Sequence, residues 1–128
     1  MATTLLIYDD NTIELTVPRV LVALGLNPVC MHLADFHPEY LLSEVFDLII
    51  FELFGENGSC MAILQELENW TATSGSEQPP VIVVTADSSA RTERAVRAAK
   101  VNFFFIKPLA DAELTSAIEQ SLQLRGPF

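Results

Sequence analysis

Four short, unbroken apolar runs limit the folds that this chain can adopt. They are TLLIY (Thr4–Tyr8), DLIIFEL (Asp47–Leu53), VIVVT (Val81–Thr85) and NFFFI (Asn102–Ile106), and a weaker run, PVCMHL, spans Pro28–Leu33. Runs of β-branched and aromatic residues without polar alternation are typical of strands covered on both faces, as in a parallel sheet. The sequence therefore predicts five buried strands.

Segments with helical periodicity separate these runs. Apolar residues from Ile13 to Leu24 recur at helical spacing, and Gly25 follows them as a stop signal. Pro38 can open a short second helix through Val45. Three more helices are expected around Ile63–Leu67, Ala95–Ala99 and Leu114–Leu122. Five βα units in succession predict an α/β fold, a doubly wound, flavodoxin-like sandwich.

Two segments fit this scheme less simply. Pro18 falls inside the first helix, where proline removes a hydrogen bond and tends to kink the chain. Either that helix bends at Pro18 or it starts late, with Thr16 as its cap. The polar stretch Thr71–Pro80 is expected to be a surface loop within the domain, because another strand follows it directly.

Composition bounds the class of protein. The chain has 128 residues, 50% of them hydrophobic, which suits one compact domain, assigned to residues 1–124 with a tail or linker stub at 125–128. A formal net charge of −10 argues against nucleic-acid binding. Cys30 and Cys60 are interpreted as buried or half-buried thiols in a reducing compartment. Without a basic leader or an apolar run of about 18 residues, a soluble cytoplasmic protein is expected.

Polar side chains stand where the predicted strands end. Because ligands bind beyond the carboxyl ends of the strands in such a sheet, these side chains are expected to share one pocket. Any one of them alone has a structural explanation, such as capping a helix, but their joint order along consecutive strands favours a site. The residues are Asp9, Asp10, Glu52, Thr85, Lys107 and Pro108.

The segments LLIYDDN, DLIIFEL, PVIVVTA and FFFIKPL resemble the receiver domain of bacterial response regulators, over nearly the whole chain from Leu5 to Leu124. The resemblance implies a five-stranded parallel sheet in the order 2-1-3-4-5, with five helices. It also implies a phosphorylation switch in a two-component system, that is, a signalling module rather than an enzyme. It further implies roles for individual residues. Asp9 and Asp10 match the acidic pair that helps to hold Mg²⁺, Thr85 matches the hydroxyl that turns inward towards the phosphoryl group, and Lys107 matches the lysine that pairs with that group. Phe104 matches the aromatic rotamer switch, and Pro108 matches the proline that follows a cis peptide bond.

Glu52 departs from the family pattern, because it occupies the position of the phospho-accepting aspartate. Its stem is one methylene longer and adds about 1.5 Å of reach. Misplacing a nucleophile by about 1 Å can cost roughly 100-fold in rate, so efficient phosphorylation of Glu52 is not expected. Three interpretations stay open: a domain biased towards its active-like state, a scaffold that no longer switches, and a module that senses Mg²⁺, pH or a ligand at the acidic pocket.

Crowded negative charge bears on the third interpretation. Asp9, Asp10 and Glu52 together bring three carboxylates near Lys107. Like charges raise carboxylate pKa values, so a bound cation or a proton can relieve the crowding. Weak Mg²⁺ binding at these three carboxylates is therefore predicted.

A basic band on the predicted fourth helix is a candidate partner surface. In receiver domains that this chain resembles, such residues can meet acidic ones on the fifth helix across a two-fold dimer built from helix 4, strand 5 and helix 5. The alternative is that the charged side chains of this helix are simply solvated and bind no partner. The basic residues are Arg91, Arg94, Arg97 and Lys100, and the acidic ones are Asp111, Glu113 and Glu119.

The function that these observations favour is an atypical receiver domain that acts on an attached output domain or a partner protein without ordinary phosphorylation. Two enzymatic or cofactor-binding alternatives compete with it. One is a conventional receiver that phosphorylates itself on Glu52. The other is an unrelated flavodoxin-like flavin protein, which is disfavoured because the first loop, from Asp9 to Thr12, is acidic and offers no phosphate cradle.

Overall fold

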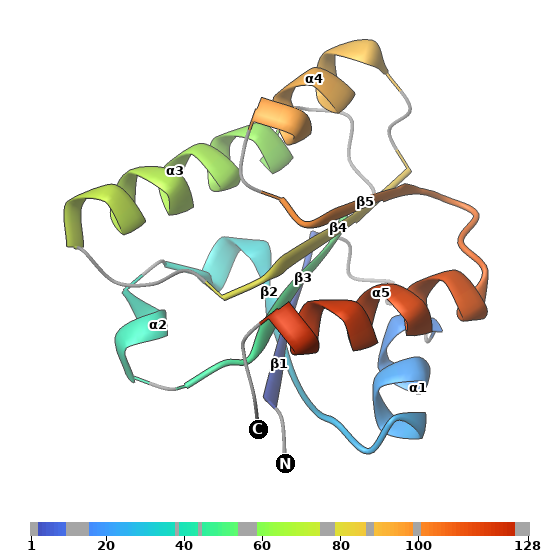
Figure 1. The fold of residues 1–128 in the computed structure, drawn as a ribbon. Coiled ribbons are helices and arrows are strands. Elements are labelled where there is room, and N and C mark those ends of the chain that lie inside the picture. The colour runs from blue at the N-terminus through green and yellow to red at the C-terminus, as the bar shows by residue number, and fades with distance from the viewer. Residues whose placement is uncertain are drawn as a thin grey trace.

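The computed structural model describes residues 3–9, 16–37, 39–43, 45–53, 59–74, 79–86, 89–98 and 101–124. Its centre is a five-stranded, wholly parallel sheet in the order β2-β1-β3-β4-β5 (Figure 1). The predicted fold class and strand order are confirmed. The strands are β1 (Thr3–Tyr8), β2 (Asn27–His32), β3 (Leu48–Leu53), β4 (Val81–Thr85) and β5 (Phe103–Ile106).

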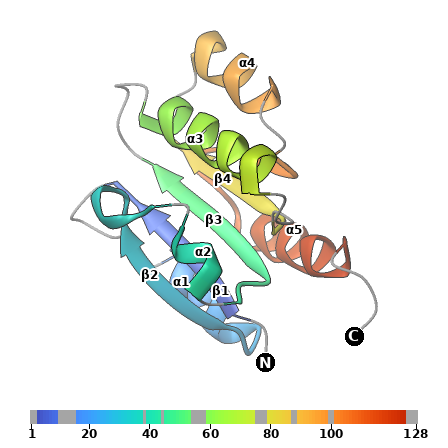
Figure 2. The ribbon, with the colours of Figure 1, turned by 90° about the vertical axis from the view of Figure 1, so that its left-hand side faces the viewer.

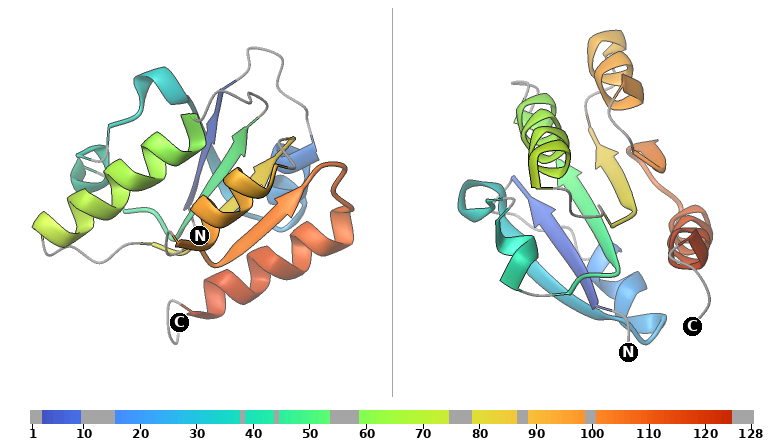
Figure 3. Two further views of the ribbon diagram at one scale, coloured as in Figure 1. Left: turned by 90° about the horizontal axis from the view of Figure 1, so that it is seen from above. Right: turned by 60° about the vertical axis from the view of Figure 1, so that its left-hand side comes forward.

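Helices cover both faces of the sheet. Figures 1 and 3 show α3 and α4 on one side of the strands and α1 and α5 on the other, and in Figure 2 α2 and α3 stand in front of the strands. The two faces are called here the α3/α4 face and the α1/α5 face. The elements are α1 (Thr16–Ala23), the 3₁₀-helix η1 (Leu33–Asp35), α2 (Tyr40–Ser43), α3 (Ser59–Ser74), α4 (Ala90–Ala98) and α5 (Asp111–Leu124).

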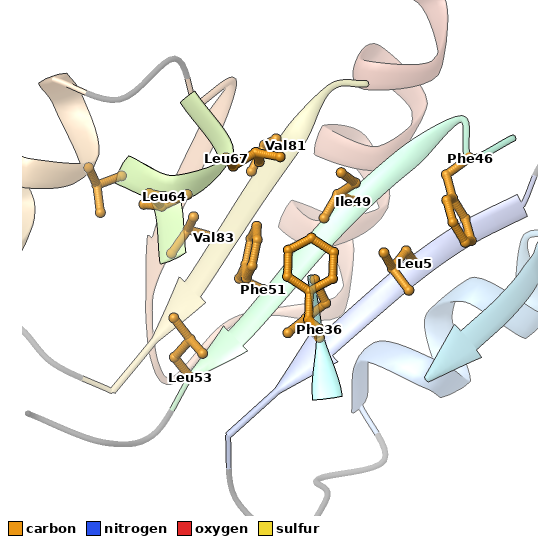
Figure 4. Close-up of a cluster of buried hydrophobic side chains, with 12 residues drawn as sticks. Leu5, Phe36, Phe46, Ile49, Phe51, Leu53, Leu64, Leu67, Val81 and Val83 are labelled. Carbon is orange, nitrogen blue, oxygen red and sulfur yellow. The ribbon is translucent and has the colours of Figure 1, made fainter. Parts of the chain in front are cut away.

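Each face of the sheet has its own core, which explains why the strands lack polar alternation. Neighbouring strand residues point to opposite faces, so Leu5 packs with α3 residues while Leu6 packs with α1 and α5 residues. Figure 4 shows the α3/α4 side, where Phe36 meets Phe51 edge-on with ring centroids 6.3 Å apart. Since both faces are buried, every residue of β3, including Glu52, is buried.

Pro18 lies within α1, which the structure describes from Thr16 to Ala23. Residues 10–15 lie outside the described residues, so the choice between a bend at Pro18 and a late start stays a prediction. The helix ends in a Schellman motif: Gly25 has φ +76°, its N–H donates to the Val22 carbonyl at 2.9 Å, and the Leu26 N–H donates to the Leu21 carbonyl at 3.0 Å.

Two side chains extend the strand pairing at the amino-terminal edge of the sheet. The Thr3 N–H donates to Asp47 Oδ2 at 2.9 Å, and the Asp47 N–H donates to the Thr3 carbonyl at 2.9 Å. Asn102 does the same for β4, since the Val81 N–H donates to Asn102 Oδ1 at 2.8 Å and the Asn102 N–H donates to the Val81 carbonyl at 2.9 Å. These clamps fix where β1 and β4 begin.

Three details of the sequence interpretation are wrong. The second helix ends at Ser43, and Val45 lies outside it with 79% of its surface exposed. The stretch from Thr71 is not all loop, because α3 continues to Ser74 and keeps its N–H groups in helical hydrogen bonds. Cys30 is exposed rather than buried, because β2 is an edge strand.

Two further sequence predictions are left as they stood. The Cys60 side chain and the tail at 125–128 lie outside the described residues, so the burial of that thiol and the 1–124 domain boundary stay predictions. In the part of the chain that the structure describes, no helix combines the length and the apolar character needed to cross a membrane.

Candidate functional site

The carboxyl ends of the five strands meet at one edge of the sheet, and Glu52 lies there as the second-last residue of β3. In register it stands between Tyr8 of β1 and Val84 of β4. Alternation along the strand places Glu52 on the α1/α5 face with Leu48 and Ile50. Only 2% of its surface is exposed, so the carboxylate is removed from water.

A buried ion pair joins Glu52 to Lys107. Glu52 Oε1 lies 3.2 Å from Lys107 Nζ, and the two side chains are 2% and 14% exposed. The Lys107 N–H donates to the Thr85 carbonyl at 2.9 Å, which fixes the lysine backbone directly after β5. A buried carboxylate is costly unless a cation and hydrogen bonds compensate it, and Lys107 supplies the cation through one of the two carboxylate oxygens.

Thr85 and Phe104 belong to the opposite face of the sheet. Thr85 ends β4 with 1% of its surface exposed, and Phe104 stands opposite Val83 and packs against the cluster on the α3/α4 face. The peptide bond between Lys107 and Pro108 is cis, as the resemblance implied. The ion pair between Glu52 and Lys107 therefore lies on the α1/α5 face of this sheet edge, while Thr85 and Phe104 lie on the α3/α4 face.

The described residues include two of the three carboxylates that were predicted to hold a magnesium ion, Asp9 and Glu52. Asp9 follows β1 directly and is half-buried, but Asp10 lies outside the described residues. Mg²⁺ requires oxygen ligands at octahedral positions, and the Glu52 carboxylate is already engaged by an ammonium group. Within the described ranges, no three metal-ligating side chains gather in one place. The assignment of Asp9, Asp10 and Glu52 as metal ligands stays a prediction.

Two side chains at this edge of the sheet, Tyr8 and His32, were not singled out from the sequence. Tyr8 is in register with both Glu52 and His32, and its ring meets the His32 ring edge-on with centroids 5.5 Å apart. Cys30 lies two residues before His32; burial around its thiol, and secondly the charge of Glu52, raise the pKa of that thiol although the residue as a whole is exposed. The sequence signal was small: an aromatic residue directly before an acidic pair.

The predicted partner surface is only partly as expected. On α4, Arg91, Arg94 and Arg97 are exposed, and Arg97 is bonded to Glu93 one turn earlier at 2.8 Å. Lys100 lies outside the described residues. Arg91 and Arg94 therefore present their charge at the surface of α4.

The acidic half of that surface differs more. Asp111 is already bonded within the chain, because Arg19 of α1 lies 2.9 Å from its carboxylate. Glu113 and Glu119 are exposed on α5. Arg19 was missed in the sequence, although it is the sole lysine or arginine among the first 90 residues. The pair ties α1 to α5 across the outside of the α1/α5 face.

Comparisons with known proteins agree with this architecture at the level of the fold. No family model matches the sequence, and no curated protein is recognisably similar to it. A signal receiver domain of a two-component histidine kinase from Clostridium thermocellum superposes with a TM-score of 0.77 at 19% identity, over 95% of this chain and 98% of that chain. FixJ-N gives a TM-score of 0.79 at 16% identity, over 100% and 98%.

A chemotaxis protein from Vibrio cholerae, CheY4, superposes with a TM-score of 0.73 at 16% identity, covering 94% of this chain and 98% of that chain. The sheet order and the helices on both faces define the chain as a flavodoxin-like α/β protein. Within that class it has the CheY-like fold of response-regulator receiver domains. At these identities the likeness concerns the fold.

Proposed function

We propose that this domain is an atypical receiver, a signalling module whose conformation is set by Glu52 instead of by a phosphorylated aspartate. The observation that supports the proposal is the buried ion pair between Glu52 and Lys107, with 3.2 Å between Oε1 and Nζ. In the family that the chain resembles, the matching lysine pairs with the phosphoryl group. Here the carboxylate itself engages that lysine.

The charge of Glu52 makes it a partial replacement for a phosphoryl group. A carboxylate carries one negative charge, against about −1.5 to −2 for a phosphate group near pH 7. The longer stem brings this charge about 1.5 Å further from the backbone than an aspartate would, towards Lys107. Phe104 is partly buried and packs against the cluster on the α3/α4 face. Of the three interpretations, the ion pair between Glu52 and Lys107 favours the active-like one.

The same contacts argue against a reaction on Glu52. A nucleophile for phosphoryl transfer must be held in line with its donor, and a misplacement of about 1 Å costs roughly 100-fold. The Glu52 carboxylate is buried and held by an ammonium group, so it is poorly placed to attack. The alternative, a receiver that is still phosphorylated or senses Mg²⁺ at this pocket, is therefore less well supported, and any Mg²⁺ binding would be weak.

The partner of this module would be an attached output domain, a separate protein or a second copy of the chain. The surface formed by α4, β5 and α5 offers exposed arginines on one side and the carboxylates of Glu113 and Glu119 on the other. Ile106, 40% exposed at the end of β5, lies between the two helices in the sequence and offers an apolar centre. A two-fold contact requires such a self-complementary patch. Exposed ion pairs would set its register more than its affinity.

The experiment is a comparison of oligomeric mass by light scattering for the native chain, Glu52→Gln and Glu66→Gln. The first variant removes the charge at the ion pair and nearly keeps the shape. The second removes one charge from an exposed position of α3 and serves as the matched control. A dimer that is lost only in Glu52→Gln supports the proposal. The same mass in all three would mean that Glu52 does not control assembly and would favour a scaffold that does not switch.

A further inference from the structure

The turn that follows β2 depends on one imidazole nitrogen. His32 is the N-cap of η1, and its Nδ1 accepts a hydrogen bond from the Ala34 N–H at 3.0 Å. Its own backbone is extended, with φ −71° and ψ 144°, as is usual for an N-cap. Histidine is an uncommon residue at this position, where Ser, Thr, Asp and Asn are preferred.

This turn carries the chain from the edge strand onto the α3/α4 face. The three-residue helix η1 closes with a backbone bond from the Phe36 N–H to the Leu33 carbonyl at 3.2 Å. Leu33 packs at the border of the core, and Phe36 is 3% exposed and contacts Phe51 edge-on (Figure 4). The His32 cap is thus the second hydrogen bond of a turn that positions a buried aromatic ring.

The cap bond exists in one protonation state of the imidazole. A nitrogen that accepts a hydrogen bond carries no proton, so His32 is neutral here, with its proton on Nε2. In the imidazolium both ring nitrogens are donors, and Nδ1–H would then face the Ala34 N–H. We propose that His32 is a pH-sensitive latch: the neutral ring closes the β2–η1 turn, and proton uptake opens it. The proposal does not depend on the function of Glu52.

Several charged and titratable residues surround the His32 ring. Tyr8 lies against the His32 ring from β1, and Glu52 stands one strand further on; both are in register with it. Asp35 of η1 lies three residues along the chain, and Asp9 follows Tyr8.

Two more groups complete the surroundings. Cys30 precedes His32 by two residues on β2, and α1, which packs against β2, carries Arg19, whose guanidinium is bonded to Asp111. Because the cap is at the surface, solvent protons reach it directly.

The test is NMR of the ¹⁵N-labelled full chain from about pH 8 to about pH 5, the range in which histidine side chains change charge. The through-bond coupling between the Ala34 nitrogen and His32 Nδ1 should be present at the upper end and lost as the His32 ring titrates. The exchange protection of the Ala34 amide should fall about fivefold, as expected for the loss of one N-cap bond.

Two variants make the result specific. His32→Asn keeps a side-chain oxygen at the cap position but does not take up a proton in this range, so the Ala34 protection should stay constant with pH. His37→Asn removes the other histidine, which is exposed and follows the turn, and should behave like the native chain. Equal pH dependence in the native chain and in His32→Asn would overturn the proposal, as would a native Ala34 amide whose coupling and protection persist while the His32 ring titrates.

Discussion

Glu52 and Lys107 form a buried ion pair that passes over the strand between them. Glu52 belongs to β3 and Lys107 follows β5, while β4 separates these two strands in the sheet. The 3.2 Å contact therefore ties together two segments that share no backbone hydrogen bonds with each other. A change in the charge of Glu52 would be transmitted to the chain that follows β5, which leads into α5, the acidic half of the candidate partner surface.

The first prediction concerns Lys107→Met, which removes the cation and leaves the Glu52 carboxylate buried. Removing one partner of a buried pair typically destabilises a protein by about 3–5 kcal/mol. We expect a loss of this order in the free energy of unfolding, measured by urea denaturation. The double variant Lys107→Met with Glu52→Gln should recover much of that loss, because no uncompensated charge is then buried.

Arg19→Met is the matched control for that measurement. It breaks the ion pair with Asp111, whose side chains are 64% and 56% exposed. Exposed pairs contribute at most about 1 kcal/mol, so this variant should unfold almost as the native chain does. If Lys107→Met were no more destabilising than Arg19→Met, the buried pair would not hold the two segments together.

The second prediction concerns Glu52→Asp, which restores the family's acceptor type. The shorter stem withdraws the carboxylate by about 1.5 Å and opens space beside Lys107. Incubated with acetyl phosphate and Mg²⁺, this variant should gain the mass of one phosphoryl group, and the native chain should not. A native chain that gains the same mass at a similar rate would show that Glu52 is itself an acceptor.

Much of the fold could be predicted because its signal is local. An unbroken run such as VIVVT is compatible with a strand buried on both faces, and the structure covers Val81–Thr85 on both sides. The end of α2 was misjudged because four helical residues carry too short a period to locate a boundary.

The third prediction uses Cys30 as a sensor of the Glu52 charge. Burial, and secondly the charge of Glu52, raise the pKa of the Cys30 thiol, which lowers its thiolate fraction at any given pH below that value. Glu52→Gln removes the second cause, so the pKa should fall and iodoacetamide should react faster at about pH 8. The comparison is made in a Cys60→Ser background, with Glu66→Gln as the control. If the Cys60→Ser protein reacted at the same rate with Glu52 as with Glu52→Gln, the charge of Glu52 would not influence the Cys30 thiol.

The fourth prediction concerns the clamp at the start of β4. Asn102→Ala removes the acceptor of the buried Val81 N–H, which lies 2.8 Å from Asn102 Oδ1. An unsatisfied buried donor costs about 1–3 kcal/mol, so thermal unfolding should occur at a lower temperature. Asn102→Asp keeps an oxygen acceptor and should lose less. Equal losses in both variants would mean that the side-chain bond contributes little.

The site was predictable only in part, because its contacts join residues far apart in the chain. The types of side chain at the strand ends were visible in the sequence, and Glu52 and Lys107 do meet. The bond between Arg19 and Asp111 was not foreseen, since it joins two residues 92 positions apart in the chain and depends on how α1 packs beside α5. Nor was the contact of Tyr8 with His32, which follows from the register of β1 against β2.

The most direct test of the role of Glu52 is an NMR comparison of the native chain with Glu52→Gln, following the Phe104 ring and the amides of Thr85 and of β5. If the charge of Glu52 holds the active-like state, the variant should show a displaced or averaged Phe104 ring and shift changes that extend along β5. Shift changes confined to the neighbours of Glu52 and Lys107, with the Phe104 ring unmoved, would contradict that role.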